Sequence, residues 1–359
     1  MKSDSISIII PTYNERENIA PLVARIKKAI NDYEYEVVFI DDNSNDGTAK
    51  EVQALSSSYP VRVIVRTGER GLASAVVEGI KHAKGELLVV MDADLQHPPE
   101  VIPKLLKEVK SGADIAIASR YVEGGSIPDW GLVRRIISRG AIILAHLLLP
   151  LSRKVNDPTS GFFVFRKEVV LGARLKPTGH KILLEILMEG KYKNTVEVPF
   201  AFSTRGRGES KLTMRQQIHY LKHLFDLMKR TGELARVAKF LLVGLSGVGV
   251  NMGLLWLLTE VFGLHYLVSA SISIETSIVS NFLLNNYFTF YDRNLPGARN
   301  FFSRLIKFNV ISLSGLAINL GVLWALTELL GLYYILSNLF GIAAASIWNY
   351  TANNWWTWK

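Results

Sequence analysis

The sequence contains no cysteine among its 359 residues. This absence excludes disulfide bonds, catalysis by a thiolate and zinc sites built from thiolates. Charge is also scarce in one region, because the last 121 positions hold only ten Asp, Glu, Lys and Arg residues, whereas such residues make up 20% of the whole chain. A long stretch so poor in charge is typical of membrane-spanning helices. We therefore expect a soluble front part followed by a membrane part.

Several common binding motifs are missing too. A dinucleotide-binding domain would need a glycine-rich turn after its first strand, but Pro11-Thr12-Tyr13-Asn14-Glu15 stands there, and the phosphate-binding pattern GxxxxGK[ST] does not occur. No nucleic-acid-binding motif is present, so we expect no nucleic-acid partner. The net charge of +9 then indicates attraction to an anionic membrane surface or to an anionic substrate. The N-terminal residues do not have the pattern of a secretory signal peptide.

The charge-poor region is an internal repeat. Residues 239–290 recur, with substitutions, 68 positions later at residues 307–358. Each copy begins with about 20 uncharged residues, the length that crosses a bilayer as a helix, then turns at Gly263 or Gly331 and returns through a second apolar stretch. We therefore predict four transmembrane helices in two hairpins. Asparagines that recur at matched depths are expected to join these helices, namely Asn251 with Asn319 and Asn281 with Asn349.

Basic residues are distributed unevenly around these spans. The two hairpin tips, residues 259–265 and 327–333, contain no Lys or Arg, whereas four basic residues precede the first span and four lie between the hairpins. The positive-inside rule places the more basic side in the cytoplasm. We therefore expect an integral, multi-pass membrane protein whose front domain lies on the cytoplasmic side. The alternative, two hairpins buried in a soluble core, is disfavoured by the length of the apolar stretches.

The front part alternates short apolar strands with helices. Strands that are apolar throughout and alternate with helices indicate an α/β fold with a mostly parallel sheet, covered on both faces. In such sheets ligands bind beyond the carboxyl ends of the strands. The expected strands are residues 5–10, 35–40, 61–65, 87–91 and 115–118, and the expected helices follow residue 15 and span 71–84 and 99–110.

Acidic residues stand at these strand ends. Asp92, Asp94 and Gln96 follow the fourth strand, and Asp41-Asp42 closes an earlier one. If the chain stays extended, residues 92, 94 and 96 project to the same side. Two carboxylates and an amide oxygen suit Mg²⁺ or Mn²⁺, which can also hold a diphosphate. His97 is interpreted as a helix-entry residue and not as a metal ligand.

Six ordered motifs carry a resemblance to a known family. They are Pro11-Thr12-Tyr13-Asn14-Glu15, Asp41-Asp42-Asn43-Ser44 with Asp46-Gly47-Thr48, Asp92-Ala93-Asp94-Leu95-Gln96-His97-Pro98-Pro99, Ser119-Arg120-Tyr121, Asp157-Pro158-Thr159-Ser160-Gly161-Phe162, and Arg205 with Gly208-Glu209-Ser210-Lys211. The first four resemble glycosyltransferase family 2 with the GT-A fold. The last two narrow the resemblance to dolichol-phosphate mannosyltransferases and their polyprenyl-phosphate relatives. The match covers roughly residues 5–230, and the four spans are similar to the GtrA-like membrane family.

The resemblance implies a role for each motif. GDP-mannose would be the sugar donor and dolichyl phosphate the acceptor, with catalytic roles for Asp94, Arg120 and Arg205. The donor nucleotide would be bound by Pro11, Thr12, Tyr13, Glu15, Asp42, Asp92 and Lys211. The cofactor, Mg²⁺ or Mn²⁺, would be held by Asp92, Asp94 and Gln96. The acceptor phosphate would be bound by Arg120, Arg134, Ser138 and Arg205.

A lipid phosphate acceptor removes the need for a strong catalytic base. A phosphate monoester is largely ionised near neutral pH, because its second pKa is about 6, and can attack the anomeric carbon directly. We therefore expect a single displacement with inversion at that carbon, in which positioning and charge neutralisation carry catalysis. Asp157 or Glu185 would be the candidates for a base or for orienting sugar hydroxyls, and Asp157 could equally be a cap beside Pro158.

The predicted organisation is a GT-A domain at residues 1–230 and a transmembrane domain at residues 237–359. Two basic amphipathic helices near 132–149 and 212–229 are expected to lie in the headgroup plane of the bilayer, although packing on the sheet is the alternative. Arg134 and Ser138 are one helical turn apart and would share a face.

Three other functions compete with the leading one. A glucosyltransferase that uses UDP-glucose and a polyprenyl phosphate would share these motifs, although the Gly208-Glu209-Ser210-Lys211 segment favours mannose. A processive polysaccharide synthase should carry a Gln-any-any-Arg-Trp motif after the metal site, and Gln216-Gln217-Ile218-His219-Tyr220 does not match it. A flippase for lipid-linked sugars, with a sugar-binding front domain, is the non-enzymatic alternative.

Overall fold

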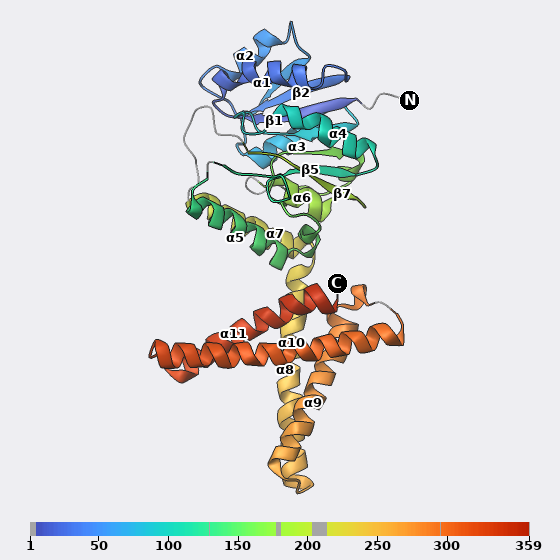
Figure 1. The fold of residues 1–359 in the computed structure, drawn as a ribbon, viewed down its shortest axis with the longest axis vertical. Helices are drawn as coiled ribbons and strands as arrows, with labels where there is room; N and C mark the ends of the chain where they lie inside the picture. The colour runs from blue at the N-terminus through green and yellow to red at the C-terminus, as the bar shows by residue number, and fades with distance from the viewer. Residues whose placement is uncertain (1–4, 129, 177–180, 203–213, 295, 359) are drawn as a thin grey trace. The chain divides into compact units, whose positions relative to one another are not determined.

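The computed structural model describes residues 5–128, 130–176, 181–202, 214–294 and 296–358, with only the backbone described at Met214 and Arg215. The chain divides into two compact units, Met1–Thr231 and Gly232–Lys359. The first is an α/β unit and the second is helical, as the sequence predicts (Figure 1).

A seven-stranded sheet forms the centre of the first unit, in the order β3-β2-β1-β4-β6-β5-β7. All neighbouring pairs are parallel except those of β6, which runs antiparallel to both β4 and β5. The prediction of a mostly parallel sheet is therefore confirmed, but β6 and β7 lie outside the predicted strands. The strands are β1 (Ile6–Thr12), β2 (Tyr35–Asp41), β3 (Val61–Val65), β4 (Leu87–Val90), β5 (Ile115–Ser119), β6 (Phe163–Arg166) and β7 (Thr195–Pro199).

Helices cover both faces of this sheet, because alternate side chains of each strand point to opposite faces. Ile8 of β1 belongs to the core cluster that includes α1 and α4. The next residue, Ile9, belongs to the cluster that includes α3 and α6. The helices of this unit are α1 (Arg16–Ala29), α2 (Thr48–Leu55), α3 (Leu72–His82), α4 (Ile102–Lys110), α5 (Leu132–Leu148), α6 (Ile182–Glu189) and α7 (Met214–Arg230).

Two helical hairpins form the second unit, and they repeat each other closely. The α8 helix (Glu233–Trp256) pairs with α9 (Tyr266–Leu284), and α10 (Ala298–Trp324) pairs with α11 (Tyr334–Ala352). The predicted hairpin turns are confirmed, since Gly263 and Gly331 adopt left-handed backbone conformations with φ of 66° and 65°, which glycine adopts without a steric penalty. A single π-helical turn follows each helix at repeat-related positions, residues 257–261, 285–289, 325–329 and 353–357.

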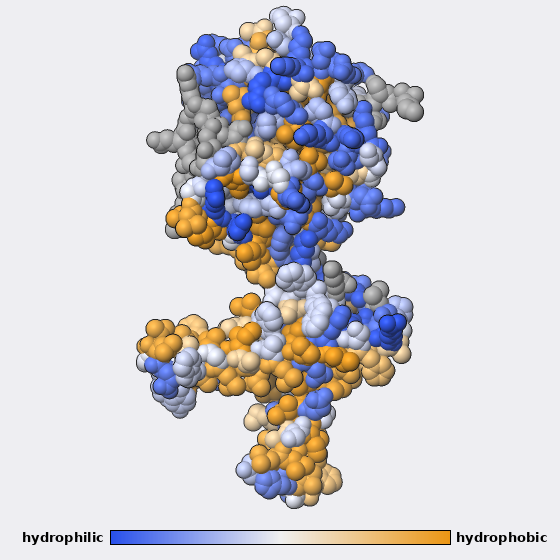
Figure 2. Space-filling view, viewed as in Figure 1, coloured by the Kyte–Doolittle hydropathy of each residue, from blue (hydrophilic) through white to orange (hydrophobic). Residues whose placement is uncertain are grey.

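Three segments of this unit are long and apolar enough to cross a membrane: Glu233–Val261, Tyr266–Thr289 and Ala298–Leu329. The predicted fourth span, α11, is a helix of 19 residues that does not reach the same apolar character, because Asn338 and Asn349 interrupt its apolar residues. Figure 2 shows hydrophobic side chains over much of the surface of these hairpins. Their exposure is consistent with a lipid surrounding, since soluble surfaces seldom show such large apolar patches.

Amide side chains join the helices within each hairpin, as predicted. Ser273 Oγ donates a hydrogen bond of 2.7 Å to Asn251 Oδ1. Asn281 packs against Gly247 so closely that a Cβ atom there would lie 2.3 Å from Asn281 Nδ2, and Asn349 packs against Gly315 in the same way in the second hairpin. An aromatic cluster contains residues of both hairpins: Phe240, Phe282, Phe290, Phe308 and Trp358.

Candidate active site at the carboxyl edge of the sheet

A cavity of about 250 Å³ in the first unit adjoins the carboxyl ends of β4 and β5. Separate segments contribute its lining: the turn after β4, the residue after β5, helix α5 with the chain that leads into it, the loop before β6, the start of α6, and α7. Its polar and aromatic lining includes Asp92, Asp94, Gln96, His97, Arg120, Trp130, Arg134, Ser138, Thr159, Lys181, Phe202 and Tyr220.

The turn after β4 carries the predicted metal ligands. The strand ends at Val90, and Leu95 has a left-handed backbone with φ of 64°, so the chain does not stay extended as expected. Asp92, Asp94 and Gln96 nevertheless all line the same cavity. The turn brings them together, with Gln96 N donating to Asp94 Oδ1 over 3.2 Å.

The donor set of this turn fits a hard divalent cation. Two carboxylates and one amide supply oxygen ligands, and the remaining positions on such an ion are normally filled by water and substrate phosphate. In the described part of the chain, no group of three or more His, Cys, Asp or Glu side chains forms a complete metal cage. An ion bound by Asp92, Asp94 and Gln96 would therefore take water or substrate phosphate oxygens as its other ligands.

The side chain of His97 stabilises the turn after β4. The short helix that follows begins at Pro99 with Pro98 as its cap residue, so His97 lies directly before the entry to that helix. Its ring is buried and stacks on Phe162 with centroids 5.3 Å apart. Its Nδ1 accepts the backbone N–H of Asp92 over 3.0 Å. The aromatic core therefore fixes the backbone of a predicted metal ligand.

The predicted donor-nucleotide residues lie at the ends of β1 and β2. Asp42 is buried, pairs with Arg66 and accepts the backbone N–H of Gly71 over 2.8 Å. Thr12 Oγ1 donates to Asp41 Oδ1 over 3.2 Å. The Asp42–Arg66 pair fixes the loop before α3, and the sequence motifs did not indicate Arg66.

The first motif continues beyond Thr12 into the start of α1. Pro11 is the register partner of Ile40 in the β1–β2 pair. The Arg70 guanidinium lies 4.9 Å from the centroid of the exposed Tyr13 ring. Glu15 precedes α1, and its backbone N–H donates to Thr48 Oγ1 over 3.0 Å. These side chains lie at the sheet edge on the strand next to β4.

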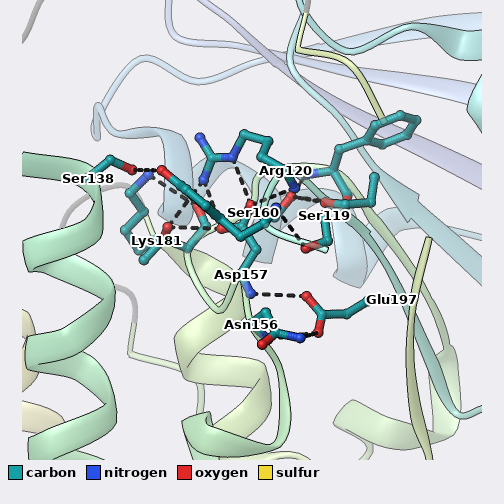
Figure 3. Close-up of polar contacts among 12 residues, drawn as sticks. Ser119, Arg120, Ser138, Asn156, Asp157, Ser160, Lys181 and Glu197 are labelled. Atoms are coloured by element: carbon teal, nitrogen blue, oxygen red, sulfur yellow. Dashed lines mark hydrogen bonds and ion pairs between the residues drawn. The ribbon is translucent and has the colours of Figure 1, made fainter. Parts of the chain in front are cut away.

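Arg120 directly follows β5 and is held by a buried ion pair. Its Nε and Nη2 donate to Asp157 Oδ2 and Oδ1 over 2.7 and 2.8 Å, and both side chains are buried. Burial alone would raise the pKa of Asp157, but Arg120 beside it holds that pKa below its usual range. The rings of Trp130 and Phe202 lie 5.5 and 5.6 Å from the guanidinium. This packing fixes the plane of Arg120, together with the ion pair to Asp157 that Figure 3 shows.

The loop that carries Asp157 is itself fixed by β7 and β5. Glu197 on β7 accepts the backbone N–H groups of Asn156 and Asp157 over 2.7 and 3.0 Å, and Ser160 Oγ donates to Ala118 O over 2.8 Å. Figure 3 shows these contacts below Arg120. Since both carboxylate oxygens of Asp157 bind Arg120, this residue positions an arginine and is poorly placed to take a proton.

Glu185, the other candidate base, has a different role. It is buried in α6, and its Oε1 accepts hydrogen bonds from Arg230 and His223 of α7. Burial raises its pKa, but the hydrogen bonds from His223 and Arg230 outweigh burial and lower it. Glu185 therefore joins α6 to α7, and it is not part of the cavity lining.

The remaining predicted acceptor residues line the cavity from α5. The guanidinium of Arg134 lies 4.0 Å from the centroid of the Trp130 ring, and Ser138 Oγ accepts the hydroxyl of Tyr121 over 2.8 Å. Both side chains line the cavity, as expected for positions one turn apart. Arg205 and Lys211 lie outside the described residues.

One cation of the cavity was not predicted. Lys181 stands directly before α6, and its Nζ donates to Thr159 O over 3.2 Å. Burial, and then the nearby charge of Arg120, lower the pKa of Lys181 to about 8. A sequence signal existed, because Lys181 adjoins an almost wholly apolar and buried helix, Ile182–Glu189. Trp130 and Phe202 had no such signal, since single aromatics in loops are common.

Comparison with known proteins assigns both units. Residues 7–171 match the model of "Glycosyl transferase family 2", and residues 239–358 match "GtrA/DPMS, transmembrane domain". A dolichol-phosphate mannosyltransferase of Pyrococcus furiosus is 50% identical over 353 residues, which cover 98% of this chain and 99% of that protein. The chain belongs to the dolichol-phosphate mannosyltransferase family.

Two other relatives named dolichol-phosphate mannosyltransferase match a smaller share of this chain. The enzymes named dolichol-phosphate mannosyltransferase from Mycosarcoma maydis and Saccharomyces cerevisiae are each 42% identical, and the matches cover 63% and 62% of this chain and 79% and 86% of those proteins. The glucosyl-3-phosphoglycerate synthase of Mycobacterium tuberculosis, solved with Mn²⁺ and UDP-glucose, has a TM-score of 0.50 at 17% identity, covering 64% of this chain and 80% of that one. That likeness concerns the fold alone.

Proposed function

We propose that this chain transfers mannose from GDP-mannose to dolichyl phosphate, giving dolichyl β-D-mannosyl phosphate and GDP. The single observation that carries the proposal is one cavity lined by a carboxylate turn, Asp92 and Asp94, and by the cations Arg120, Arg134 and Lys181. Two anionic substrates could meet there, one through a divalent cation and the other through basic side chains. The 50% identity to a dolichol-phosphate mannosyltransferase along nearly the whole chain supports the same reaction.

The donor would occupy the edge formed by β1, β2 and β4. Asp92, Asp94 and Gln96 would hold Mg²⁺ or Mn²⁺, and the bound ion would neutralise the departing diphosphate. Asp42, fixed by Arg66, would accept hydrogen bonds from the nucleoside. The other proposed contacts with the nucleotide are Pro11, Thr12, Tyr13, Glu15 and Lys211.

The acceptor phosphate would enter from the α5 side. Arg134, Ser138 and Arg205 would bind its oxygens. Arg120 would contribute a remaining N–H, because its Nε and Nη2 groups donate to Asp157. An ionised phosphate oxygen so held can attack the anomeric carbon in line with the leaving diphosphate. No general base is required, and the α-linked sugar would become β-linked by single displacement.

The bilayer would lie against the cavity entrance on the cytoplasmic side. Helix α5 exposes a run of large apolar side chains, Leu132, Val133 and Ile136, and α7 exposes Ile218, Leu221 and Phe225. Basic amphipathic helices of this kind lie in the headgroup region. The absence of Lys and Arg from both hairpin tips supports the cytoplasmic orientation of the first unit.

Turnover of the purified full chain tests this function. Dolichyl phosphate in detergent would be offered with radiolabelled GDP-mannose or UDP-glucose, with and without EDTA and with Mg²⁺ or Mn²⁺ restored. We expect labelled lipid from GDP-mannose only, lost with EDTA and recovered with the metal. Transfer from UDP-glucose alone would replace the donor assignment, and the absence of any labelled lipid would reject the enzymatic function in favour of lipid transport.

A further inference from the structure

The positive charges of the cavity are not equally available to a ligand. Arg120 donates Nε and Nη2 to the two oxygens of Asp157, so one buried carboxylate balances its charge. Lys181 donates to a neutral carbonyl oxygen, that of Thr159. An ammonium group has three N–H donors, and this contact uses one of them. As far as the described residues show, Lys181 therefore keeps both charge and donors for a cavity ligand.

The surroundings of Lys181 favour an added anion. Its side chain lies in the same cavity as Arg120 and Arg134. Burial together with Arg120 lowers its pKa to about 8, although the nearby carboxylates of Asp157 and Asp92 oppose that shift. A cation in such a place is destabilised by desolvation and by like charge. A phosphate bound beside Lys181 would counteract both penalties, because an opposite charge stabilises the charged ammonium group. Lys181 also stands before the first turn of α6, where backbone N–H groups favour negative charge.

The contacts of Lys181 favour the acceptor over the donor, although Asp92 and Asp94 line the same cavity. The donor's diphosphate is assigned to the divalent cation on the turn after β4. Lys181 instead binds the loop that carries Asp157, and Figure 3 shows it in the group of contacts that also contains Ser138 and Arg120. Arg134 and Ser138, which line the same cavity, are the residues assigned to the acceptor phosphate.

We propose that Lys181 binds the phosphate group of the acceptor lipid, sharing its oxygens with Arg134 and Ser138. This inference rests on the proposed function for the identity of the acceptor. Lysine suits the task as a compact point charge that can approach a phosphate oxygen from the side opposite to the planar guanidinium of Arg134. The six sequence motifs do not indicate this role, because Lys181 lies outside all of them.

Equilibrium binding to the full chain in detergent tests the assignment without turnover. Citronellyl phosphate, a short isoprenoid phosphate, and GDP with Mn²⁺ would each be titrated by calorimetry into wild type, Lys181→Met, Lys181→Arg and the control Lys191→Met. Lys191 is an exposed lysine at the other end of α6. We expect Lys181→Met to weaken citronellyl phosphate binding about tenfold or more, since hydrogen bonds to charged groups have effects of that size, and to leave GDP binding unchanged.

The two further variants separate binding from folding. Lys181→Arg should recover most of the affinity because it keeps the charge, and Lys191→Met should match wild type. Inorganic phosphate should compete with citronellyl phosphate in wild type and lose that ability in Lys181→Met, which would place the contact at the phosphate and not at the lipid chain. Unchanged citronellyl phosphate binding in Lys181→Met, or equal weakening of GDP binding, would overturn the assignment.

The same measurements distinguish this inference from the proposed function. Suppose that Lys181→Met weakens citronellyl phosphate binding but the wild type forms no mannosyl lipid. This outcome would support the phosphate site and reject the proposed reaction. Suppose instead that the wild type forms mannosyl lipid and Lys181→Met binds citronellyl phosphate normally. This outcome would support the reaction and reject the role of Lys181.

Discussion

The two halves of the sheet edge each contain a buried aspartate paired with an arginine, but they are built differently. Asp42 and Arg66 are 24 residues apart in sequence and come from neighbouring parallel strands, β2 and β3. Arg120 and Asp157 are 37 residues apart and meet where the antiparallel β6 interrupts the parallel order. The donor half thus follows from repeated strand–helix units, whereas the acceptor half needs a topological exception that brings distant loops together.

The largest predicted effect is on the free energy of unfolding, when the buried pair of the acceptor half is broken. Asp157→Ala would leave Arg120 buried without its partner, and breaking such a pair costs about 3–5 kcal/mol. Urea unfolding of the full chain in detergent, followed by a signal from the first unit, measures the effect. The matched control is Glu100→Ala, because Glu100 receives the same two-bond arrangement from Arg25, over 2.9 and 2.7 Å, but both side chains are exposed.

Exposed pairs contribute about 0.2–1 kcal/mol, so Glu100→Ala should change unfolding little. Comparable losses in Asp157→Ala and Glu100→Ala would mean that burial does not set the strength of the acceptor-side pair. The comparison between the two halves would then lose its energetic basis.

The next largest effect should be on turnover. It concerns the turn after β4, which lies between the donor half and the acceptor half of the sheet edge. Asp94→Ala removes a carboxylate from the metal turn, and removing one group that stabilises transition-state charge typically lowers the rate about 10²–10³-fold. Mn²⁺ titration of mannosyl transfer measures the loss, and the midpoint of thermal unfolding should not fall. Asp32→Ala, at an exposed position, is the control. Wild-type rates in Asp94→Ala would reject the metal assignment.

The smallest of the three effects should be confined to the donor half. Asp42→Asn would remove the charge that pairs with Arg66 and weaken the hydrogen bond from Gly71. We expect GDP binding to weaken about tenfold, the range for one charged hydrogen bond, with citronellyl phosphate binding unchanged. Calorimetric titration of both ligands checks this. Equal losses for both would show that the two halves act as one site.

The same contrast explains what could be predicted from the sequence. The strands that precede Asp42 and Asp92 are short, apolar and local, and the hairpin turns at Gly263 and Gly331 stand at matching repeat positions, so local pattern was sufficient. Arg66 and Lys181 could not be assigned in this way. Their roles depend on which loops the sheet order brings together, and that order includes β6, whose four residues, Phe163–Arg166, give no clear sign of direction.

Leu95 has a consequence for protein engineering. A leucine with φ of 64° bears a steric penalty of roughly 1–2 kcal/mol, between two residues assigned to the metal. Glycine would remove that penalty, but it would also remove a side chain that packs against the core of the first unit. The replacement would also free the backbone that aims Asp94 and Gln96 into the cavity. Stability and catalysis should therefore both favour leucine at this position, despite its strained backbone.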